Sequence, residues 1–522
     1  MKHLLLFVCL LIVFVSCDNS EEEAPTVQFE SDRTSISLEG NVSSKDSISI
    51  KTGLSWTATV TPATAAWLHL SKTKGEGNDK IVLTVVENNL TGTTRNATVS
   101  ITSPGNTSAK PIIVTVAQTA SSNWVKTFGG QSEESFNAVA RSSDGGFFAG
   151  GGSSSKDGEL SGNHGSADAW VVKVDANGNK VWQKVYGGSG AESVSGIVAT
   201  QDGGCIFSAT TTSRDQQVIT NLGSTNIWLV RLDASGNIVW QKTFGTSNID
   251  LAHAITASTD GKYIVAGATT KTVSYGFNDD DFYAVKFDGS GNIVWEKTIV
   301  NTSSYRDRVY GITASPDGGC VLAGETMPNT TESGSANAYN DALLVKLDGA
   351  GNEQWQTIIK GSRSEQAQSI TTSKDGGYIV AGHSQSVDGD MAFNTGQTDY
   401  WVAKVDQNGN KLWVKMYGGS GQDEAHSIVS DPDGYIIAGS SNSSHAGLEP
   451  SNGANDFWII KINEAGNMLW QKSAGGSKHD RAYDLTKTNE GDIIVAGHTQ
   501  GMIKGVLERD EIGDGLLVKL KQ

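Results

Sequence analysis

Residues 399–419 read DYWVAKVDQNGNKLWVKMYGG, and this stretch decides the fold. Apolar and aromatic residues alternate up to Asp406, a short turn holds Asn408 and Gly409, and a second run carries Trp413. Alternation with a period of two indicates a β-strand, and Asn-Gly tolerates the positive φ that a tight turn requires. The stretch therefore predicts a β-hairpin.

The chain repeats this hairpin along most of its length. Versions of it occupy residues 168–188, 226–245, 281–299, 341–361 and 456–476. Its tryptophan recurs as Trp124, Trp182, Trp240, Trp295, Trp355, Trp413 and Trp470, at spacings of 58, 58, 55, 60, 58 and 57 residues. A constant spacing of this size indicates a tandem array of one structural unit.

Each unit contains a second hairpin, marked by Asp-Gly between two apolar runs, as in ITTSKDGGYIVAG at residues 370–382. Four-stranded units repeated around an axis predict a β-propeller, and seven units lie within the usual range. The Trp124 strand has no unit before it, and residues 516–520 form a third strand with no fourth strand after it. If these two strands pair, the N-terminal strand closes the ring and no sheet edge remains unpaired.

The sequence DANGNKVW at residues 175–182 resembles the repeat of quinoprotein-like propellers. The resemblance implies that each tryptophan docks one blade against its neighbour. No vicinal cysteine pair or calcium and cofactor cluster accompanies it, so we expect no cofactor. Asp175, Asn177 and Asn179 are spaced as in a calcium loop, but the distal bidentate Glu is missing and these residues also form turns, so we expect no metal.

The N-terminus carries a predicted targeting signal. Residues 1–16 form a signal peptide with an apolar run too short to anchor a protein across a bilayer. Cys17 follows it directly, which resembles the lipobox of bacterial lipoproteins and implies lipidation of Cys17. Residues 17–26 form an acidic tether, and Ser20 followed by three glutamates resembles the surface-export signal of Bacteroidetes lipoproteins. An ordinary secretory signal and a simple solvated tether are the alternatives.

Residues 27–120 predict strand after strand without a competing helical period, as in an immunoglobulin-like β-sandwich. The words WTA at 56–58, GEG at 75–77, ENN at 87–89, RNA at 95–97 and VAQ at 116–118 resemble, in this order, the BACON domain. That family is named for suspected carbohydrate binding. Trp56 and Trp67 could stack on sugars, but we expect them in the core because tryptophan is mostly buried.

The fold class is therefore all-β, with a sandwich at 27–120 followed by a seven-bladed propeller at 121–522. The net charge of −17 argues against nucleic acid as a partner. Cys205 and Cys320 follow Asp-Gly-Gly in non-adjacent repeats, so we expect two buried thiols and no disulfide.

Two groups of residues are candidate binding sites. One carboxylate precedes each first strand at intervals of 57 or 58 residues, which predicts an acidic ring: Glu134, Glu192, Asp250, Asp307, Glu365, Asp423 and Asp480. The ring could attract cations or basic partners, or each carboxylate could accept N–H groups within its own loop, which we favour. The second group is aromatic residues and arginine in loops of repeats three to five, where a glycan could bind: Tyr275, Phe277, Tyr305, Arg306, Tyr339 and Phe393.

We expect a monomeric, non-enzymatic lipoprotein of the outer membrane that faces the cell exterior and binds a glycan, glycoprotein or protein. Two alternatives stay open. A polysaccharide hydrolase or lyase would need two carboxylates in a cleft, and no residue pair is marked for that role beyond its position. A periplasmic scaffold would resemble the propeller lipoprotein of outer-membrane assembly machinery.

Overall fold

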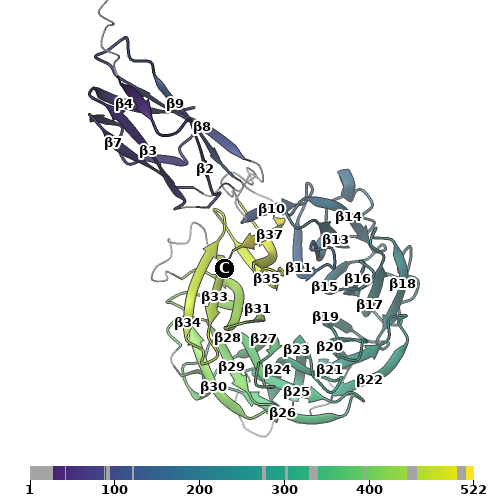
Figure 1. The fold of residues 1–522 in the computed structure, drawn as a ribbon. Coiled ribbons are helices and arrows are strands. Elements are labelled where there is room, and N and C mark those ends of the chain that lie inside the picture. The colour runs from purple at the N-terminus through teal and green to yellow at the C-terminus, as the bar shows by residue number, and fades with distance from the viewer. Residues whose placement is uncertain are drawn as a thin grey trace, which may run out of the picture. The chain divides into compact units, whose positions relative to one another are not determined.

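The computed structural model describes residues 28–41, 43–87, 89, 94–119, 123–272, 278–299, 304–328, 339–392, 394–443, 455–501 and 513–521. The chain divides into two compact units, Met1–Asn89 with Thr93–Ser121 and Leu90–Gly92 with Ser122–Gln522. Regular structure in both is almost entirely β-strand (Figure 1). Among the described residues no helix is long and apolar enough to cross a membrane.

The first unit contains two sheets that share one hydrophobic core. One sheet has the order β1-β3-β7-β5 and the other β2-β9-β8-β4-β6. The strands are β1 Phe29–Ser31, β2 Ser35–Leu38, β3 Lys45–Thr52, β4 Ser55–Thr61, β5 Leu68–Leu70, β6 Lys74–Glu76, β7 Asp79–Val85, β8 Arg95–Thr102 and β9 Ile112–Gln118. Trp56 and Trp67 are buried in this core, which confirms the expectation that they pack inside the domain.

Every repeat in the second unit forms four antiparallel strands, as the two hairpins predict. Five four-stranded sheets and one eight-stranded sheet, which joins two repeats through a parallel bridge between Asp280 and Arg306, make up this unit. The sheets are β11 Glu134–Arg141 to β14 Lys180–Tyr186, β15 Glu192–Ala199 to β18 Ile238–Phe244, β19 Asp250–Ala257 to β26 Glu353–Ile359, β27 Glu365–Thr372 to β30 Lys411–Tyr417, β31 Asp423–Asp431 to β34 Met468–Ala474, and β35 Asp480–Lys487 with β36 Ile493–Thr499, β37 Asp514–Leu520 and β10 Trp124–Phe128.

The remaining strands of these sheets are β12 Phe147–Ser153, β13 Asp168–Val174, β16 Cys205–Thr211, β17 Asn226–Leu232, β20 Tyr263–Thr272, β21 Asn278–Phe287, β22 Ile293–Ile299, β23 Ser304–Ala314, β24 Cys320–Pro328, β25 Asp341–Leu347, β28 Tyr378–Ser384, β29 Asp399–Val405, β32 Gly434–Ser441 and β33 Asp456–Ile462. Third strands such as β13 and β29 are buried along their whole length. They read as continuous apolar runs because neighbouring sheets cover both of their faces.

The two ends of the second unit meet in one sheet. β10 pairs antiparallel with β37, and Trp124 lies opposite Lys519. This is the pairing that the phase of the repeat predicts. The first strands also contact one another in sequence order from β11 to β35, and β35 contacts β11. Figure 1 shows these first strands toward the middle of the unit and fourth strands such as β18 and β30 toward its outside.

The repeated tryptophans hold each repeat to the next one. The Trp295 ring donates its Nε1–H to the carbonyl oxygen of Gly349 (3.1 Å), in the β25–β26 turn of the following repeat. Its ring lies on Gly351, where a Cβ atom would come within 2.9 Å of Cδ2. Gly351 has a φ of +81°, so this position requires glycine for both the backbone and the close approach. The same ring-on-glycine contact joins Trp124 to Gly178.

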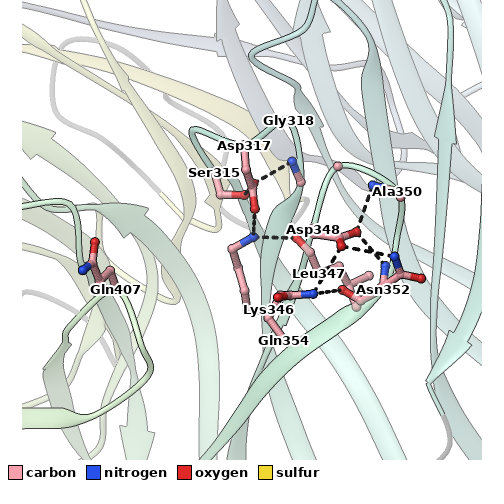
Figure 2. Close-up of polar contacts among 12 residues, drawn as sticks. Ser315, Asp317, Gly318, Lys346, Leu347, Asp348, Ala350, Asn352, Gln354 and Gln407 are labelled. Atoms are coloured by element: carbon pink, nitrogen blue, oxygen red, sulfur yellow. Dashed lines mark hydrogen bonds and ion pairs between the residues drawn. The ribbon is translucent and has the colours of Figure 1, made fainter.

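The Asp-Gly turns are also tied to the third strands by ion pairs. In Figure 2, Lys346 of β25 bonds the Asp317 carboxylate (2.7 Å) and the carbonyl oxygen of Leu347 (2.7 Å). Asp317 also accepts the N–H of Gly319. Every repeat has such a pair: Lys173–Asp144, Arg231–Asp202, Lys286–Asp260, Lys346–Asp317, Lys404–Asp375, Lys461–Asp433 and Lys519–Asp492. The aspartate of this turn therefore does more than accept backbone N–H groups.

The spacing that resembles a calcium loop is turn structure. Figure 2 shows that the Asp348 carboxylate accepts the N–H groups of Ala350 (2.9 Å) and Asn352 (2.8 Å) and the Asn352 side-chain amide. Asp175 accepts the corresponding three bonds from Asn177 and Asn179. Within the described ranges no group of three or more His, Cys, Asp and Glu side chains could hold a metal ion.

Candidate functional site

The first strands of the seven repeats share an irregularity. Each has a register shift three residues after its buried carboxylate, and the skipped residue has no partner in the ladder. A β-bulge of this kind re-aims one side chain away from the regular alternation. The seven bulge residues are Asn137, Ser195, His253, Tyr310, Gln368, His426 and Tyr483.

All seven bulge residues line one cavity of about 410 Å³, which we call the central cavity. All are half-buried. The residues that follow them, such as Ser369, Ser427 and Asp484, complete its wall. A concave site of this volume, with a few convergent polar groups, is typical of small-ligand binding. Unlike the carboxylates, which repeat one chemistry, the bulge residues differ among the repeats.

One part of the wall is a histidine–tyrosine pair. His253 and Tyr310 pack edge to face with ring centroids 5.5 Å apart. The Tyr310 hydroxyl donates to Glu325 (2.8 Å), and Glu325 also accepts from the Asn340 side chain (2.7 Å). Burial, together with the positive charge of Arg308, lowers the pKa of His253 to about 4. His253 is therefore neutral at physiological pH.

A second pair has the same composition. His426 and Tyr483 have ring centroids 5.6 Å apart. Burial, with His383 and Arg481 nearby, lowers the pKa of His426 to about 3. The nearest carboxylate oxygen, from Glu424, lies 4.0 Å from His426 Nε2. In both His253 and His426, Nε2 is buried and has no hydrogen-bond partner among the described residues.

The cavity also contains one ionisable carboxyl group, which has a structural role. Asp484 accepts the N–H of Val139 (2.8 Å) from β11 and the hydroxyl of Ser427 (2.8 Å) from β31. It therefore ties its own strand, β35, to the first strands on either side. Burial raises the pKa of Asp484 to about 6. Asn137 is similarly tied to the next sheet, since its amide donates to the Ser193 hydroxyl (3.1 Å) and the Val194 carbonyl (2.9 Å).

A second hollow of about 350 Å³ adjoins the central cavity, and Tyr483 lines both. The other walls of this hollow come from the beginnings of β11 and β15, the end of β12 and His498 of β36. His498 Nδ1 lies 3.1 Å from the Glu134 carbonyl oxygen. We call this space the entry hollow, because it lies where the first strands begin, on the side of the connections between second and third strands.

The predicted acidic ring is buried. Glu134, Glu192, Asp250, Asp307, Glu365, Asp423 and Asp480 are each at most 2% exposed. Six of them accept the N–H of the residue four positions earlier, such as Gly188 for Glu192 (2.9 Å). These carboxylates hold their own loops, so they present no charge to a partner. Burial and the nearby Asp456 raise the pKa of Asp480 to about 6.

Only some of the loop residues expected to bind a glycan lie within the described residues. Tyr275, Phe277 and Phe393 lie outside the described residues. Tyr305 lies in β23, next to Arg306, whose Nε is 3.7 Å from an Asp280 carboxylate oxygen. Tyr339 precedes β25 and is 41% exposed. Cys17 also lies outside the described residues, whereas Cys205 and Cys320 are free and buried, as expected.

The bulge residues could have been found in the sequence. Each stands three residues after a member of the predicted acidic ring, so they repeat at the same intervals. The regular spacing of the bulge residues is hard to notice because their residue type changes from repeat to repeat, whereas the carboxylates and tryptophans are constant.

Comparisons with known proteins bear mainly on the first unit. Residues 28–117 match the family described as the viral BACON domain, which confirms the resemblance. Regulatory protein FlaEY of Caulobacter vibrioides is 23% identical over 175 residues, which cover 31% of this chain and 18% of that protein. The uncharacterized WD repeat-containing protein L264 of Acanthamoeba polyphaga mimivirus is 21% identical over 324 residues, 46% of this chain and 23% of that protein. The chain thus spans about a fifth of the length of these relatives.

Among solved structures, a Bacteroides ovatus GH5 xyloglucanase in complex with a XXXG heptasaccharide matches 22% of each chain at 22% identity, with a TM-score of 0.16. Puromycin hydrolase matches 79% of this chain and 56% of its own at 11% identity, with a TM-score of 0.38.

Proposed function

We propose that this protein is an outer-membrane surface lipoprotein that binds a glycan, glycoprotein or protein partner without catalysis. In this proposal the first unit is an immunoglobulin-like sandwich that spaces or assists the second unit. The repeats of the second unit close into a seven-bladed β-propeller, and the lipid on Cys17 anchors the chain.

Three contacts support the closed propeller. β10 pairs with β37, so the two ends of the unit share one sheet. β35 contacts β11, which continues the series of contacts between first strands. Trp124 of β10 lies on Gly178 of the following sheet, as Trp182 lies on Gly236. A closed ring removes the unpaired strand edges that an open array would leave.

The observation that carries the binding function is the central cavity. The fold needs only that each first strand have a bulge, yet the seven bulge residues include two histidines, two tyrosines and two amides. Function is expected where repeats differ, because a binding site is added to a fold and does not follow from it. The variation is concentrated on one concave surface, which favours a single ligand site for the whole unit.

The carboxyl groups of this cavity favour binding over catalysis. A glycosidase needs two carboxyl groups that flank the scissile bond. Asp484 is the one carboxylate among the described residues that line the central cavity, and it is occupied by bonds from Val139 and Ser427. Two carboxylates line the entry hollow: Glu134, which is buried and accepts bonds from Gly130 and Ser153, and Glu133, which is exposed.

A glycan array with residues 18–522 tests the proposed function. Specific binding supports a glycan ligand. If no glycan on the array binds and the protein cross-links specifically to an outer-membrane protein on intact cells, the partner is a protein instead. Protease treatment of intact cells tests the location: digestion of the native lipoprotein supports an exterior site, and resistance until the outer membrane is opened would overturn it. Loss of fatty-acid labelling in Cys17→Ala tests the anchor.

A further inference from the structure

We propose that the central cavity and the entry hollow together bind the end of a neutral glycan chain, with the terminal sugar among the bulge residues and the next sugar beyond Tyr483. This inference rests on the proposed binding function and names the ligand class and its site. Four observations carry it: the lack of formal charge on the bulge residues, their aromatic pairs, the size of the cavity and the residue that it shares with the hollow.

The wall of the central cavity is polar, and Asp484 is its one carboxylate among the described residues. The seven bulge residues are amides, a hydroxyl, phenols and imidazoles, and burial keeps the pKa of both imidazoles far below neutrality. Of the arginines near this wall, Arg306 and Arg308 both lie against Asp280, and Arg481 lies near His426. An anionic ligand would lose its hydration beside the Asp484 carboxylate, which is costly. A neutral ligand with many hydroxyl groups avoids this cost.

The order of the bulge residues suits a sugar ring. Two histidine–tyrosine pairs, from β19 with β23 and from β31 with β35, alternate with the amides of Gln368 and Asn137. An aromatic side chain offers an apolar face and a polar tip, so it can pack on the C–H face of a sugar. The Gln368 amide and the Tyr483 hydroxyl can bond the hydroxyl groups at its rim.

The size of the cavity limits the ligand to a chain end. A volume of about 410 Å³ is near the lower end of ligand pockets, which suits one or two sugars. The entry hollow adds about 350 Å³ and shares Tyr483 with the cavity. Its walls include Ser135, Ser154 and Ser193, which offer more hydroxyl partners. A chain entering there would place its last sugar in the cavity and continue outward.

The test is titration calorimetry of residues 18–522 with gluco-, xylo-, manno- and galacto-oligosaccharides of one to six units. Oligogalacturonides serve as charged probes and cyclic glucans as probes without an end. We expect one neutral series to bind, with affinity rising from one to about two or three units and then levelling. Equal binding of a cyclic glucan would refute end recognition, and preference for oligogalacturonides would refute the neutral class.

Variants locate the site. Tyr483→Ala and the double variant His253→Ala/His426→Ala should each weaken binding about tenfold or more, because both remove aromatic contact and polar partners. Tyr483→Phe keeps the ring and should lose less. His479→Ala changes an exposed residue outside the cavity and should bind like the parent chain. Urea unfolding of each variant checks that it is folded.

The outcomes separate this inference from the proposed function. If the glycan array is positive and the cavity variants bind normally, the glycan binds elsewhere: the inference fails and the function stands. If neither the array nor the oligosaccharides show binding, both the glycan function and the inference fail.

Discussion

The contact between tryptophan and glycine in successive repeats predicts how much stability the protein loses when a methyl group is added to that glycine. Gly351→Ala places a Cβ atom at a φ of +81°, which costs about 1–2 kcal/mol for an L-residue. The same atom would lie 2.9 Å from Cδ2 of Trp295 and 3.1 Å from Cε of Lys297. Overpacking of this kind costs about 1–3 kcal/mol more.

Gly376→Ala is the matched control for this change. Gly376 has a φ of +85° in the Asp-Gly turn of another sheet, and no atom lies within 4 Å of its added Cβ. It should therefore incur only the backbone cost. The difference in free energy of unfolding between the two variants, about 1–3 kcal/mol, measures the packing of Trp295 on the neighbouring repeat.

Urea unfolding followed by tryptophan fluorescence measures this difference. The second unit holds 11 of the 13 tryptophans, since only Trp56 and Trp67 lie in the first unit, so the signal reports mainly on the repeats. With a slope of about 3 kcal/mol per molar urea, Gly351→Ala should unfold about 0.3–1 M earlier than Gly376→Ala. Equal midpoints would refute the tryptophan–glycine contact. Trp295→Phe in the Gly351→Ala background should recover part of the loss if the contact is correct.

Three further predictions concern buried groups. Asp484→Asn should remove a pH dependence: the raised pKa of about 6, against 3.8 in the unfolded chain, gives stability at low pH that is lost as pH rises through 6. The parent should therefore lose about 1.4 kcal/mol between pH 5 and 7.5 relative to the variant in urea unfolding, and parallel curves would contradict the assignment. Lys346→Met should cost about 1–2 kcal/mol, because the Lys346 side chain is only 8% exposed, although its partner Asp317 is 46% exposed. Lys180→Met, whose ion pair of equal length is exposed on both sides, should cost less than about 0.5 kcal/mol; equal effects would show that burial of the lysine is not decisive. In residues 18–522, Cys205 and Cys320 should not react with a thiol reagent at pH 8 until urea is added, since burial raises the pKa of both thiols to about 12; reaction in the native protein would contradict their burial.

Six of the seven carboxylates accept N–H groups within their own loops, which is the alternative that the sequence analysis favoured, and the reason is physical. Seven carboxylates at constant spacing resemble a charged ring, but each follows a turn whose N–H groups need acceptors. Glu192 accepts bonds from Gly188, Thr211 and Ser213, and Gly187 packs directly between Glu192 and Asp168. Buried N–H groups must be paired, so the carboxylates serve the fold and lie beneath the surface. A sequence shows the charge of a residue but not whether its loop encloses it.

The three-residue strands of the first unit cannot be derived from the sequence. β1, β5 and β6 are each too short to show a full alternation. Short edge strands are defined by their partners, here β3, β7 and β4, and partners are set by the packing of the whole domain.

The repeated four-stranded unit, its turns and the pairing of β10 with β37 could all be predicted from the sequence. These depend on a period of two, on Asp, Asn and Gly at turn positions and on the phase of the repeat, all of which are local or strictly periodic. Only the tertiary structure showed that Asn137, His253, Tyr310, His426 and Tyr483 share one cavity. A bulge shifts the alternation by one residue and turns a side chain to another face, and the sheets that bring these bulges together lie far apart along the chain.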